Sequence, residues 1–499
     1  DSRFGWSKAL ELFLEILSSK QYSDIENLII DYDYVRPYGA RIKTFGGQAS
    51  GHEALQQIFE KISKLFEGGK SKWVTPTSIQ VLDMATAIAE GVVAGGTRRS
   101  ALIVFCDPDD VEVLEAKKNL YTQDNGSWNI DKNISHRSLS NNTVLYEERP
   151  TYEQLKKQFQ LIRYSGEPSF GNLSAMRERR EDVQGGNPCF EILLRDRGTC
   201  NLTEVNLMGF VDENGSIDLE ELTKAQRYSA KMGYRRASIE LELNEWNLVN
   251  QEDRLTGCSL TGVMDFKNST NMTDDKLAGL MRYLREVAHN EVEVMANKLN
   301  LNPSKLITTI KPSGTISLLP TVSSGVHFSH SPYYIRRIRI NSSDPLSKAL
   351  DKNGFTSHPE NGDDKLNPKT KVYEFPVKAP EGKTKYNVGA IEQLELYKLM
   401  MENYVDHNAS NTIHVKDDEW NDVIDWVYDN WDSVVGVTFL SLSDSFYQLM
   451  PLEAITEEEF NKMVTITPKF RPTMLKEFEN FAEEFELDDE CDTGLCPIR

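Results

Sequence analysis

Residues 185–194 read GGNPCFEILL, and no other segment of the chain restricts its structure so tightly. Pro188 fixes the backbone immediately before Cys189, and the two leading glycines permit an unusual loop. In an extended segment, residues two apart face the same side. We therefore expect the side chains of Asn187, Cys189 and Glu191 to point into one cavity, where an amide, a thiol and a carboxylate would meet one substrate.

Cys189 allows two interpretations. A free cysteine is most often a buried structural residue. A hydrolase would need a histidine beside the thiol to make a thiolate, and no histidine lies nearby in the sequence. The flanking amide and carboxylate instead favour hydrogen-atom chemistry, in which the carboxylate handles a hydroxyl proton.

The other cysteines differ in their surroundings. Cys491 and Cys496 form a C-x4-C pair in an acidic C-terminal segment without histidine, which disfavours zinc and favours thiol–disulfide exchange. Two idle thiols are the alternative. Cys106 ends an apolar strand and Cys258 lies in TGCSLTGVMDF, so both are predicted to be core residues.

Composition excludes several classes of protein. The 499 residues include 56 Lys and Arg against 77 Asp and Glu, a net charge of −21, which argues against a general nucleic-acid or membrane-surface binder. We expect no signal peptide, because DSRFGWSKAL is polar and then amphipathic, and the sequence contains no apolar run of membrane-spanning length. Six cysteines in so long a chain do not form a secreted disulfide scaffold, so we expect a cytoplasmic protein.

Helical and strand patterns alternate along the chain, which predicts an α/β protein with a parallel sheet or barrel. Residues 107–148 look partly irregular, and residues 341–388, rich in Pro, Gly, Asp and Lys, look like a loop-rich insertion. Helices are predicted at 7–19, 53–69, 78–92, 151–165, 172–184, 218–248, 274–299, 391–404, 416–431 and 456–464. Strands are predicted at 200–207 and 333–340. Residues 95–105 are predicted to be a glycine loop that enters a buried strand, and residues 304–320 a strand, a tight turn and a further element.

The order of several motifs resembles that of the ribonucleotide reductases, in particular the adenosylcobalamin-dependent class. The motifs are NPCFE (187–191), CNLTEVNL (200–207), KPSGT (311–315), YYIRRIR (333–339) and CDTGLCPIR (491–499). RIKTFGG (41–47), RRSA (98–101) and GVHFSHSPYYIRRIR (325–339) are most similar to the monomeric ribonucleoside-triphosphate reductases.

This resemblance implies a ten-stranded α/β barrel with residues 185–194 as a buried finger loop through its centre. It also implies an oxidoreductase that reduces ribonucleoside triphosphates to 2′-deoxyribonucleoside triphosphates for DNA synthesis. Cys189 matches the cysteine that becomes a thiyl radical and takes the 3′ hydrogen of the ribose. Glu191 matches the base that receives the 3′-hydroxyl proton, and Asn187 matches the residue that hydrogen-bonds the ribose.

Cys200 matches one half of the redox pair that reduces the 2′ carbon. Its partner in the family lies on the first barrel strand, and no cysteine here fits that position. We therefore expect that N-terminal strands are missing from this chain and that a second polypeptide, or an excised upstream part, completes the barrel and the pair; Cys106 or Cys258 is the alternative partner. By the same resemblance, Cys491 and Cys496 would pass electrons from a thioredoxin-like reductant.

The remaining predicted sites also depend on the resemblance. Pro312, Ser313, Gly314 and Thr315 would bind the substrate phosphates, although an ordinary β-turn fits that motif equally well. Tyr333, Tyr334, Arg336 and Arg337 would contact adenosylcobalamin, which carries its own cobalt and needs no metal ligand from the protein; an amphipathic edge strand is the alternative.

The same comparison divides the chain into four parts and adds a deoxynucleoside triphosphate effector. The parts are 1–95 (part of the effector site and the start of the barrel), 96–340 (catalytic barrel), 341–484 (remaining barrel and cobalamin-contacting region) and 485–499 (flexible redox tail). Neither nucleic acid nor membrane is expected as a partner. Alternatives are a dimeric cobalamin reductase acting on ribonucleoside diphosphates, a thiol-disulfide oxidoreductase, and a non-catalytic nucleotide-binding subunit.

Overall fold

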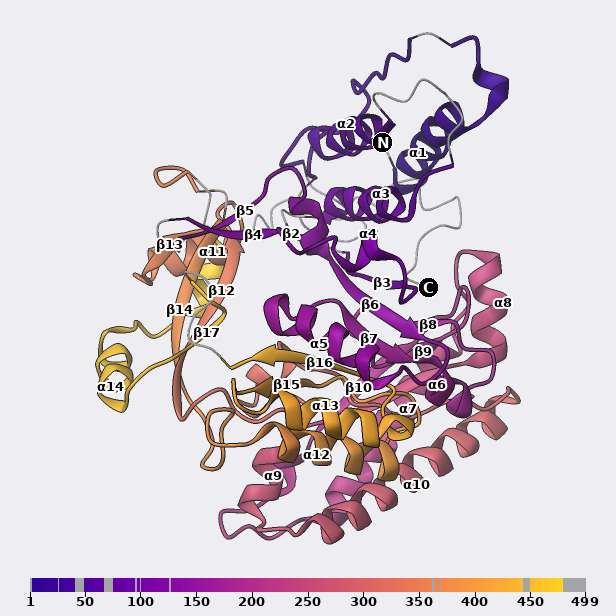
Figure 1. The fold of residues 1–499 in the computed structure, drawn as a ribbon. Coiled ribbons are helices and arrows are strands. Elements are labelled where there is room, and N and C mark those ends of the chain that lie inside the picture. Colours follow the sequence, from indigo (N-terminus) through magenta and orange to yellow (C-terminus); the bar gives the residue numbers. More distant parts are fainter. Residues whose placement is uncertain are drawn as a thin grey trace.

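The computed structural model describes residues 2–478 except 26, 41–48, 67–74, 95–96, 99, 125–126, 361–363, 369 and 443–448. The fold is mixed α/β (Figure 1). The helices are α1 Arg3–Ser18, α2 Glu53–Phe66, α3 Ser78–Gly91, α4 Val111–Leu114, α5 Tyr152–Ser165, α6 Leu173–Arg179, α7 Leu219–Ala237, α8 Asn244–Asp253, α9 Val263–Ser269, α10 Asp274–Leu299, α11 Pro345–Lys352, α12 Ala390–Asn403, α13 Trp420–Asp429 and α14 Glu457–Ile466.

The strands are mostly short. They are β1 Val93–Ala94, β2 Thr97–Arg98, β3 Leu102–Cys106, β4 Tyr121–Asp124, β5 Ser127–Ile130, β6 Ser140–Tyr146, β7 Ser169–Asn172, β8 Gly185–Gly186, β9 Leu193–Leu194, β10 Asn201–Asn206, β11 Thr256–Thr261, β12 Tyr333–Asn341, β13 Ser357–Pro359, β14 Thr370–Lys378, β15 Thr412–Val415, β16 Gly436–Ser441 and β17 Leu452–Ala454.

The central strands form two parallel groups that run in opposite directions. One sheet has the order β15-β16-β7-β6-β3, in which β7, β6 and β3 are parallel and β16 pairs antiparallel with β7. Strands β10 and β11 are parallel, and single bridges continue from β11 through Thr308 to Ala409, three residues before β15. Joined by these bridges, the strands form one series with β3 at one edge and β10 at the other. Within the described residues, β3 and β10 do not pair with each other.

A hairpin made of β8 and β9 carries the predicted finger loop. Gly185 pairs with Leu194 and Gly186 with Leu193. The Leu193 amide donates a hydrogen bond to His407 Nδ1 (3.2 Å), so the hairpin is attached to the segment between α12 and β15. This attachment holds the loop among the strands of the series.

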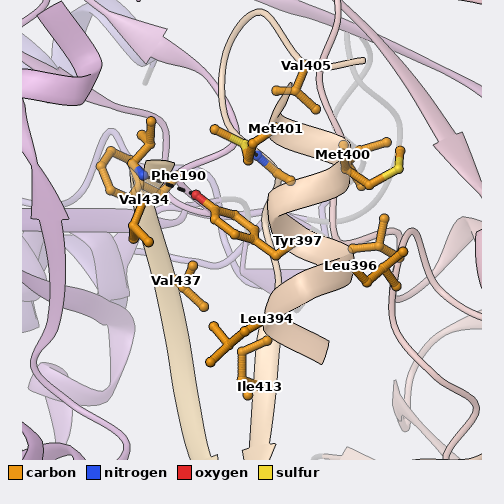
Figure 2. Packing of buried hydrophobic residues seen from close by; sticks show 14 of the residues in the cluster. Phe190, Leu394, Leu396, Tyr397, Met400, Met401, Val405, Ile413, Val434 and Val437 are labelled. Atoms are coloured by element: carbon orange, nitrogen blue, oxygen red, sulfur yellow. Dashed lines mark hydrogen bonds between the residues drawn. The ribbon is translucent and has the colours of Figure 1, made fainter. Parts of the chain in front are cut away.

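The main hydrophobic core lies between the central strands and the helices that cover them. Figure 2 shows Tyr397 of α12 extending from its helix toward Val434 and Phe190, with Leu394 and Met401 on the same helix. Phe190 belongs to the finger loop, so one continuous core supports both the barrel segments and the loop. A second, smaller core joins α1 and α2 beside α3, and these helices gather at one end of the molecule (Figure 1).

Three secondary-structure predictions are wrong. The helix predicted at 218–248 is two helices, because α7 ends at Ala237 and α8 begins only at Asn244. The predicted insertion 341–388 contains β14, which pairs with β12 over nine residues and buries Val372 and Tyr373, one on each side of the strand. Residues 107–148 contain β6, an inner strand of the central sheet. Composition obscured these strands because their pairing partners are distant in sequence.

None of the helices in the described part of the chain is long and apolar enough to span a bilayer. The helices of the central body instead bury one face. Helix α10, for example, buries Leu277, Met281, Leu284, Ala288 and Val292 at the helical spacing that predicted it from sequence.

A buried carboxylate, Asp406, connects α10 to the strand series. It accepts hydrogen bonds from Arg285 Nη2 (2.6 Å), His289 Nε2 (2.7 Å) and the amides of Ile307 and Thr308 (both 3.0 Å). Burial opposes ionisation, but the hydrogen bonds and charges of His289 and Arg285 outweigh it and lower the pKa of Asp406. The carboxylate is therefore ionised wherever the protein is folded near neutral pH.

Replacing Asp406 with asparagine is expected to reduce the free energy of unfolding by about 3 kcal/mol at pH 7, because it removes one partner of a buried ion pair. A carboxyl group with a lowered pKa stabilises the fold above its unfolded pKa, about 3.9, and this contribution is lost as the pH falls toward the folded pKa. Urea unfolding between pH 7 and pH 3 should show the difference between wild type and Asp406→Asn shrinking below about pH 4. A pH-independent difference would contradict this assignment.

Candidate active site

The candidate active site is a tight turn at the tip of the β8–β9 hairpin. The Phe190 amide donates to the Asn187 carbonyl (2.7 Å), and Pro188 and Cys189 occupy the turn between them. The prediction of an extended segment is therefore wrong. An asparagine followed by proline favours a turn of this kind, so the sequence did contain the signal.

Phe190 fixes the turn in the core. Its φ of +58° is left-handed, which is uncommon for a non-glycine residue. Its ring fills a hollow left by three glycines, since a Cβ added at Gly171, Gly186 or Gly436 would lie 3.0, 2.6 or 2.3 Å from that ring. Phe105 of β3 packs edge-on at a centroid distance of 5.2 Å. The two residues flanking Phe190 are thereby held in defined directions.

The structure brings two of the three predicted side chains into direct contact. Asn187 Nδ2 donates to Glu191 Oε2 (2.8 Å), while Asn187 Oδ1 accepts from the Ile192 amide (2.9 Å). Glu191 is only 2% exposed. Burial raises the pKa of Glu191, and its own amide, Asn187 and the charge of Lys311 offset this only in part. The carboxyl group can thus carry a proton at a higher pH than an ordinary glutamate.

Cys189 occupies the exposed tip of the turn. Although the residue reaches solvent, the protein atoms packed around its sulfur, and then the nearby charge of Glu191, raise the pKa of Cys189 to about 11, against an opposing effect of Lys311. At neutral pH the group is therefore an S–H and not a thiolate, which suits a hydrogen-atom donor better than a nucleophile. The loop is not enclosed as expected, because the described strand series remains open between β3 and β10.

Three residues behind the turn were missed by sequence reasoning. Thr309 Oγ1 donates to the Glu191 carbonyl (2.7 Å), and the Asn408 amide donates to the same carbonyl (3.2 Å). Lys311 forms an ion pair with Glu204 of β10 (3.2 Å) and is close enough to influence both Cys189 and Glu191. Lys311 begins the KPSGT motif and could have been noticed, whereas nothing local marks Thr309 or Asn408.

Cys200 lies half buried immediately before β10. Burial, then the charge of Glu191, raises the pKa of Cys200 well above its ordinary value, which places it in electrostatic reach of the site. Cys106 and Cys258 are buried, as predicted for core residues. In the β10–β11 register Cys258 faces Thr203, so its Cα lies about 11 Å from that of Cys200, beyond disulfide reach.

The predicted phosphate turn has unusual geometry. Ser313 has a φ of +52° and is 3% exposed, and its Oγ has no hydrogen-bond partner among the described residues. An added Cβ at Gly314 would meet nothing within 4 Å, so space is open there. The turn leads into a short 3-10 helix, Ile316–Leu318.

The residues of strand β12 that were predicted to contact the cofactor lie in different environments. Tyr333 donates to Glu457 (2.9 Å), and Arg337 is buried in ion pairs with Glu374 (2.7 Å) and Glu453 (2.6 Å), so both have protein partners. Arg336 differs, because its buried Nε has no hydrogen-bond partner in the part of the chain that the structure describes.

His330 lies close to Tyr334, which precedes Arg336 by two residues in β12. The centroids of the His330 and Tyr334 rings are 5.9 Å apart. Like Arg336 Nε, the buried Nε2 of His330 has no hydrogen-bond partner among the described residues. Burial and the charge of Lys385 lower the pKa of His330 to about 3, so its ring is neutral at physiological pH. Within the described ranges no group of three or more His, Cys, Asp and Glu side chains could hold a metal ion.

Several predicted features lie outside the described residues. These are the redox cysteines Cys491 and Cys496, the rest of the segment 485–499, and the RIKTFGG motif at 41–47.

Two segments match known protein families. Residues 1–66 match the insertion domain of B12-dependent ribonucleotide reductase, and residues 171–273 match the ribonucleotide reductase barrel domain. The second segment contains the turn and both Cys189 and Cys200.

Known proteins also match this chain over its whole length. The chain is 28% identical to the adenosylcobalamin-dependent ribonucleoside-triphosphate reductase of Lactobacillus gasseri and 27% identical to that of Lactobacillus leichmannii. It covers 70% of the length of each of these two proteins. The crystal structure of a B-12 dependent (class II) ribonucleotide reductase superposes with a TM-score of 0.78 at 24% identity, over 97% of this chain and 69% of the other. That similarity shows the fold of the present chain.

Proposed function

Because this chain belongs to the B12-dependent ribonucleotide reductase family, we propose that it acts in the adenosylcobalamin-dependent reduction of ribonucleoside triphosphates to 2′-deoxyribonucleoside triphosphates. The observation that supports this most directly is the turn that holds the protonated thiol of Cys189 beside the buried carboxyl of Glu191. A cytoplasmic location agrees with this function, since its substrates are there.

The side chains of the turn have complementary roles in this reaction. Adenosylcobalamin supplies an organic radical when its cobalt–carbon bond breaks homolytically. Cys189 gives up the hydrogen atom of its S–H bond and then takes the 3′ hydrogen of the ribose. Glu191 accepts the 3′-hydroxyl proton, and Asn187 keeps the Glu191 carboxyl oriented toward the sugar.

Cys200 supplies reducing equivalents in this proposal. Reduction of the 2′ carbon consumes two thiols, releases water and leaves a disulfide, so Cys200 needs a second thiol. Cys258 is out of reach in the register, and the Cys106 thiol is buried against the Thr143 carbonyl (3.7 Å), so we assign the second thiol to a residue outside the described ones. We place it on an N-terminal polypeptide that completes the barrel, and assign re-reduction to Cys491 and Cys496 with a thioredoxin-like reductant.

The substrate phosphates are assigned to Pro312–Thr315. The unpartnered Oγ of Ser313 and the open space at Gly314 support this, because a phosphate needs donors and close backbone approach. A deoxynucleoside triphosphate effector is assigned to the region 1–95. Its site would lie away from the turn.

The cofactor is assigned to the face of β12 that carries Tyr334 and Arg336. The unpartnered Nε of Arg336 and Nε2 of His330 fit the peripheral amides of a corrinoid, which offer both acceptors and donors. The ion-paired Arg337 and the Glu457-bound Tyr333 fit less well.

Replacing Arg336 with methionine is expected to weaken adenosylcobalamin binding about tenfold, since a hydrogen bond from a charged donor is lost. Binding would be followed by the change in the visible absorption of the cofactor during titration, without turnover. Arg339→Met, at an exposed position on the opposite side of the same strand from Arg336, is the control and should bind normally, since Arg339 pairs with Glu360. Equal affinities for all three proteins would remove Arg336 from the cofactor site.

The proposed function is tested with the protein purified from its own cells. Adenosylcobalamin, a ribonucleoside triphosphate and a dithiol are added, and the expected products are deoxynucleotide and a cobalt-coupled radical signal in electron spin resonance. A parallel reaction with the diphosphate should be slower. Disulfide reduction without either product would favour a thiol-disulfide oxidoreductase and overturn the proposal.

A further inference from the structure

Asn408 is fully buried behind the turn and uses every polar atom it has. Its Nδ2 donates to the Phe190 carbonyl (2.7 Å) and the Gly436 carbonyl (3.1 Å). Its backbone amide donates to the Glu191 carbonyl (3.2 Å), and its own carbonyl lies 2.8 Å from Thr309 Oγ1, whose one proton is shared between this carbonyl and that of Glu191. One residue thus contacts the two successive carbonyls that follow Cys189.

Tyr397 determines which way the Asn408 amide points. The Tyr397 hydroxyl accepts from the Val435 amide (3.1 Å), so its proton is free to be donated to Asn408 Oδ1 (2.9 Å). With Oδ1 facing the hydroxyl, Nδ2 must face the Phe190 and Gly436 carbonyls. Figure 2 shows Tyr397 extending from α12 toward this region of the core.

The carbonyl that Asn408 holds belongs to the left-handed residue of the turn. A non-glycine residue at φ +58° persists only where its surroundings enforce that conformation. If the Phe190 peptide relaxed toward an ordinary φ, the directions of its two neighbours, Cys189 and Glu191, would change relative to each other. Packing of the ring against glycines resists displacement, whereas hydrogen bonding by Asn408 resists rotation of the peptide.

We propose that Asn408, oriented by Tyr397, is a positioning residue that keeps Phe190 left-handed and thereby sets the mutual geometry of the Cys189 thiol and the Glu191 carboxyl. Its importance for catalysis rests on the function proposed above, but its effect on the turn does not. Asn408 does not touch the reacting atoms; it acts through the backbone of residues 190 and 191.

The test measures the Cys189 thiol directly, without cofactor or substrate. The rate of alkylation by iodoacetamide is followed from pH 7 to pH 10, with the modified Cys189 peptide quantified by mass spectrometry. Glu191 and Lys311 are the charged groups that influence this thiol, with opposite effects. A relaxed turn would move the thiol away from Glu191 and from the protein atoms packed around its sulfur, and so return its pKa from about 11 toward its ordinary value near 9.

For Asn408→Ala we expect the alkylation rate at pH 8 to rise about tenfold. The thiolate fraction would increase about a hundredfold, and the lower intrinsic nucleophilicity of a less basic thiolate would offset about tenfold of that gain. Asn408→Asp, which cannot donate to the two carbonyls, should behave like alanine. Tyr397→Phe, which leaves the amide in place but unoriented, should give about a threefold rise, and it decides the question if the Asn408 variants do not fold.

Gln393→Ala is the matched control. Gln393 is also a buried amide that donates to two backbone carbonyls and accepts one amide, but those partners are Gly389 and His414, remote from the turn. It should lower Tm as Asn408→Ala does while leaving the Cys189 profile unchanged. If Asn408→Ala and Tyr397→Phe also lower Tm without moving that profile, Asn408 is merely structural and the inference fails.

Turnover provides the second readout. If the proposed function holds, Asn408→Ala should lower kcat about a hundredfold with little change in KM, because the substrate site remains while the reacting groups are misaligned. A shifted alkylation profile in a protein that makes no deoxynucleotide would support the positioning role and reject the proposed function. Normal turnover with an unshifted profile would reject the positioning role and support the function.

Discussion

Replacing Cys189 with serine should abolish deoxynucleotide formation, with a fall in kcat of at least about 10⁴-fold, while Tm changes by little. An O–H bond is much stronger than an S–H bond, so serine cannot deliver a hydrogen atom to a carbon radical at a useful rate. Cys189 lies at the exposed tip of its turn, and an exposed substitution usually changes stability by no more than about 0.5 kcal/mol. Radiolabelled substrate and thermal unfolding provide the two measurements.

Cys106→Ser is the control for this experiment. Cys106 is buried and its thiol donates weakly to the Thr143 carbonyl (3.7 Å), so serine there should lower Tm and leave the chemistry of the turn intact. The two variants should thus show opposite patterns: one inactive and stable, the other active and destabilised. Residual turnover in Cys189→Ser that exceeds contamination by wild-type enzyme would show that another group carries the radical.

The contrast between these two cysteines could be predicted from sequence, because each depends on local features. Cys189 is flanked by proline, asparagine and glutamate, whereas Cys106 ends an apolar strand. Most helices could also be predicted, since a 3.6-residue apolar period such as that of α10 is visible in any window of the chain. The break between α7 and α8 was missed because SIELEL (238–243) contains neither proline nor glycine, although its alternation of apolar and acidic residues departs from helical spacing.

The support of the turn could not be predicted, for a physical reason. The hydrogen bond from Asn408 to Phe190 joins residues 218 positions apart. The hollow for the Phe190 ring is made by Gly171 and Gly436, which come from different strands and are conspicuous only once those strands pair. A local motif can therefore indicate the reacting groups, while their geometry is set by residues that tertiary packing brings together.

Glu191→Gln should lower kcat by about 10³-fold, the typical contribution of a positioned general base. In the wild-type protein the acidic limb of the pH profile should lie above the ordinary range of a carboxyl group, because burial raises the pKa of Glu191 and the base must be ionised to accept a proton. The glutamine variant should lose that limb together with its activity. An exposed carboxylate, Glu147, provides the control, and Glu147→Gln should keep both.

Glu191→Gln should lower activity but not thermal stability, and this difference separates the role of Glu191 in catalysis from any role in folding. A carboxyl group whose folded pKa is raised binds more protons in the folded state, so its contribution to stability is present below the unfolded pKa and is lost as the pH rises through the folded pKa. At pH 7 the buried Glu191 carboxylate therefore costs stability, and Glu191→Gln should unfold at the same or a higher Tm than wild type, with the difference vanishing toward pH 4. A variant that is both inactive and less stable at pH 7 would indicate that Glu191 holds the turn together instead of accepting the proton. If Glu191→Gln loses activity and keeps its stability, the burial of the Glu191 carboxylate, which costs stability, serves the reaction and not the fold.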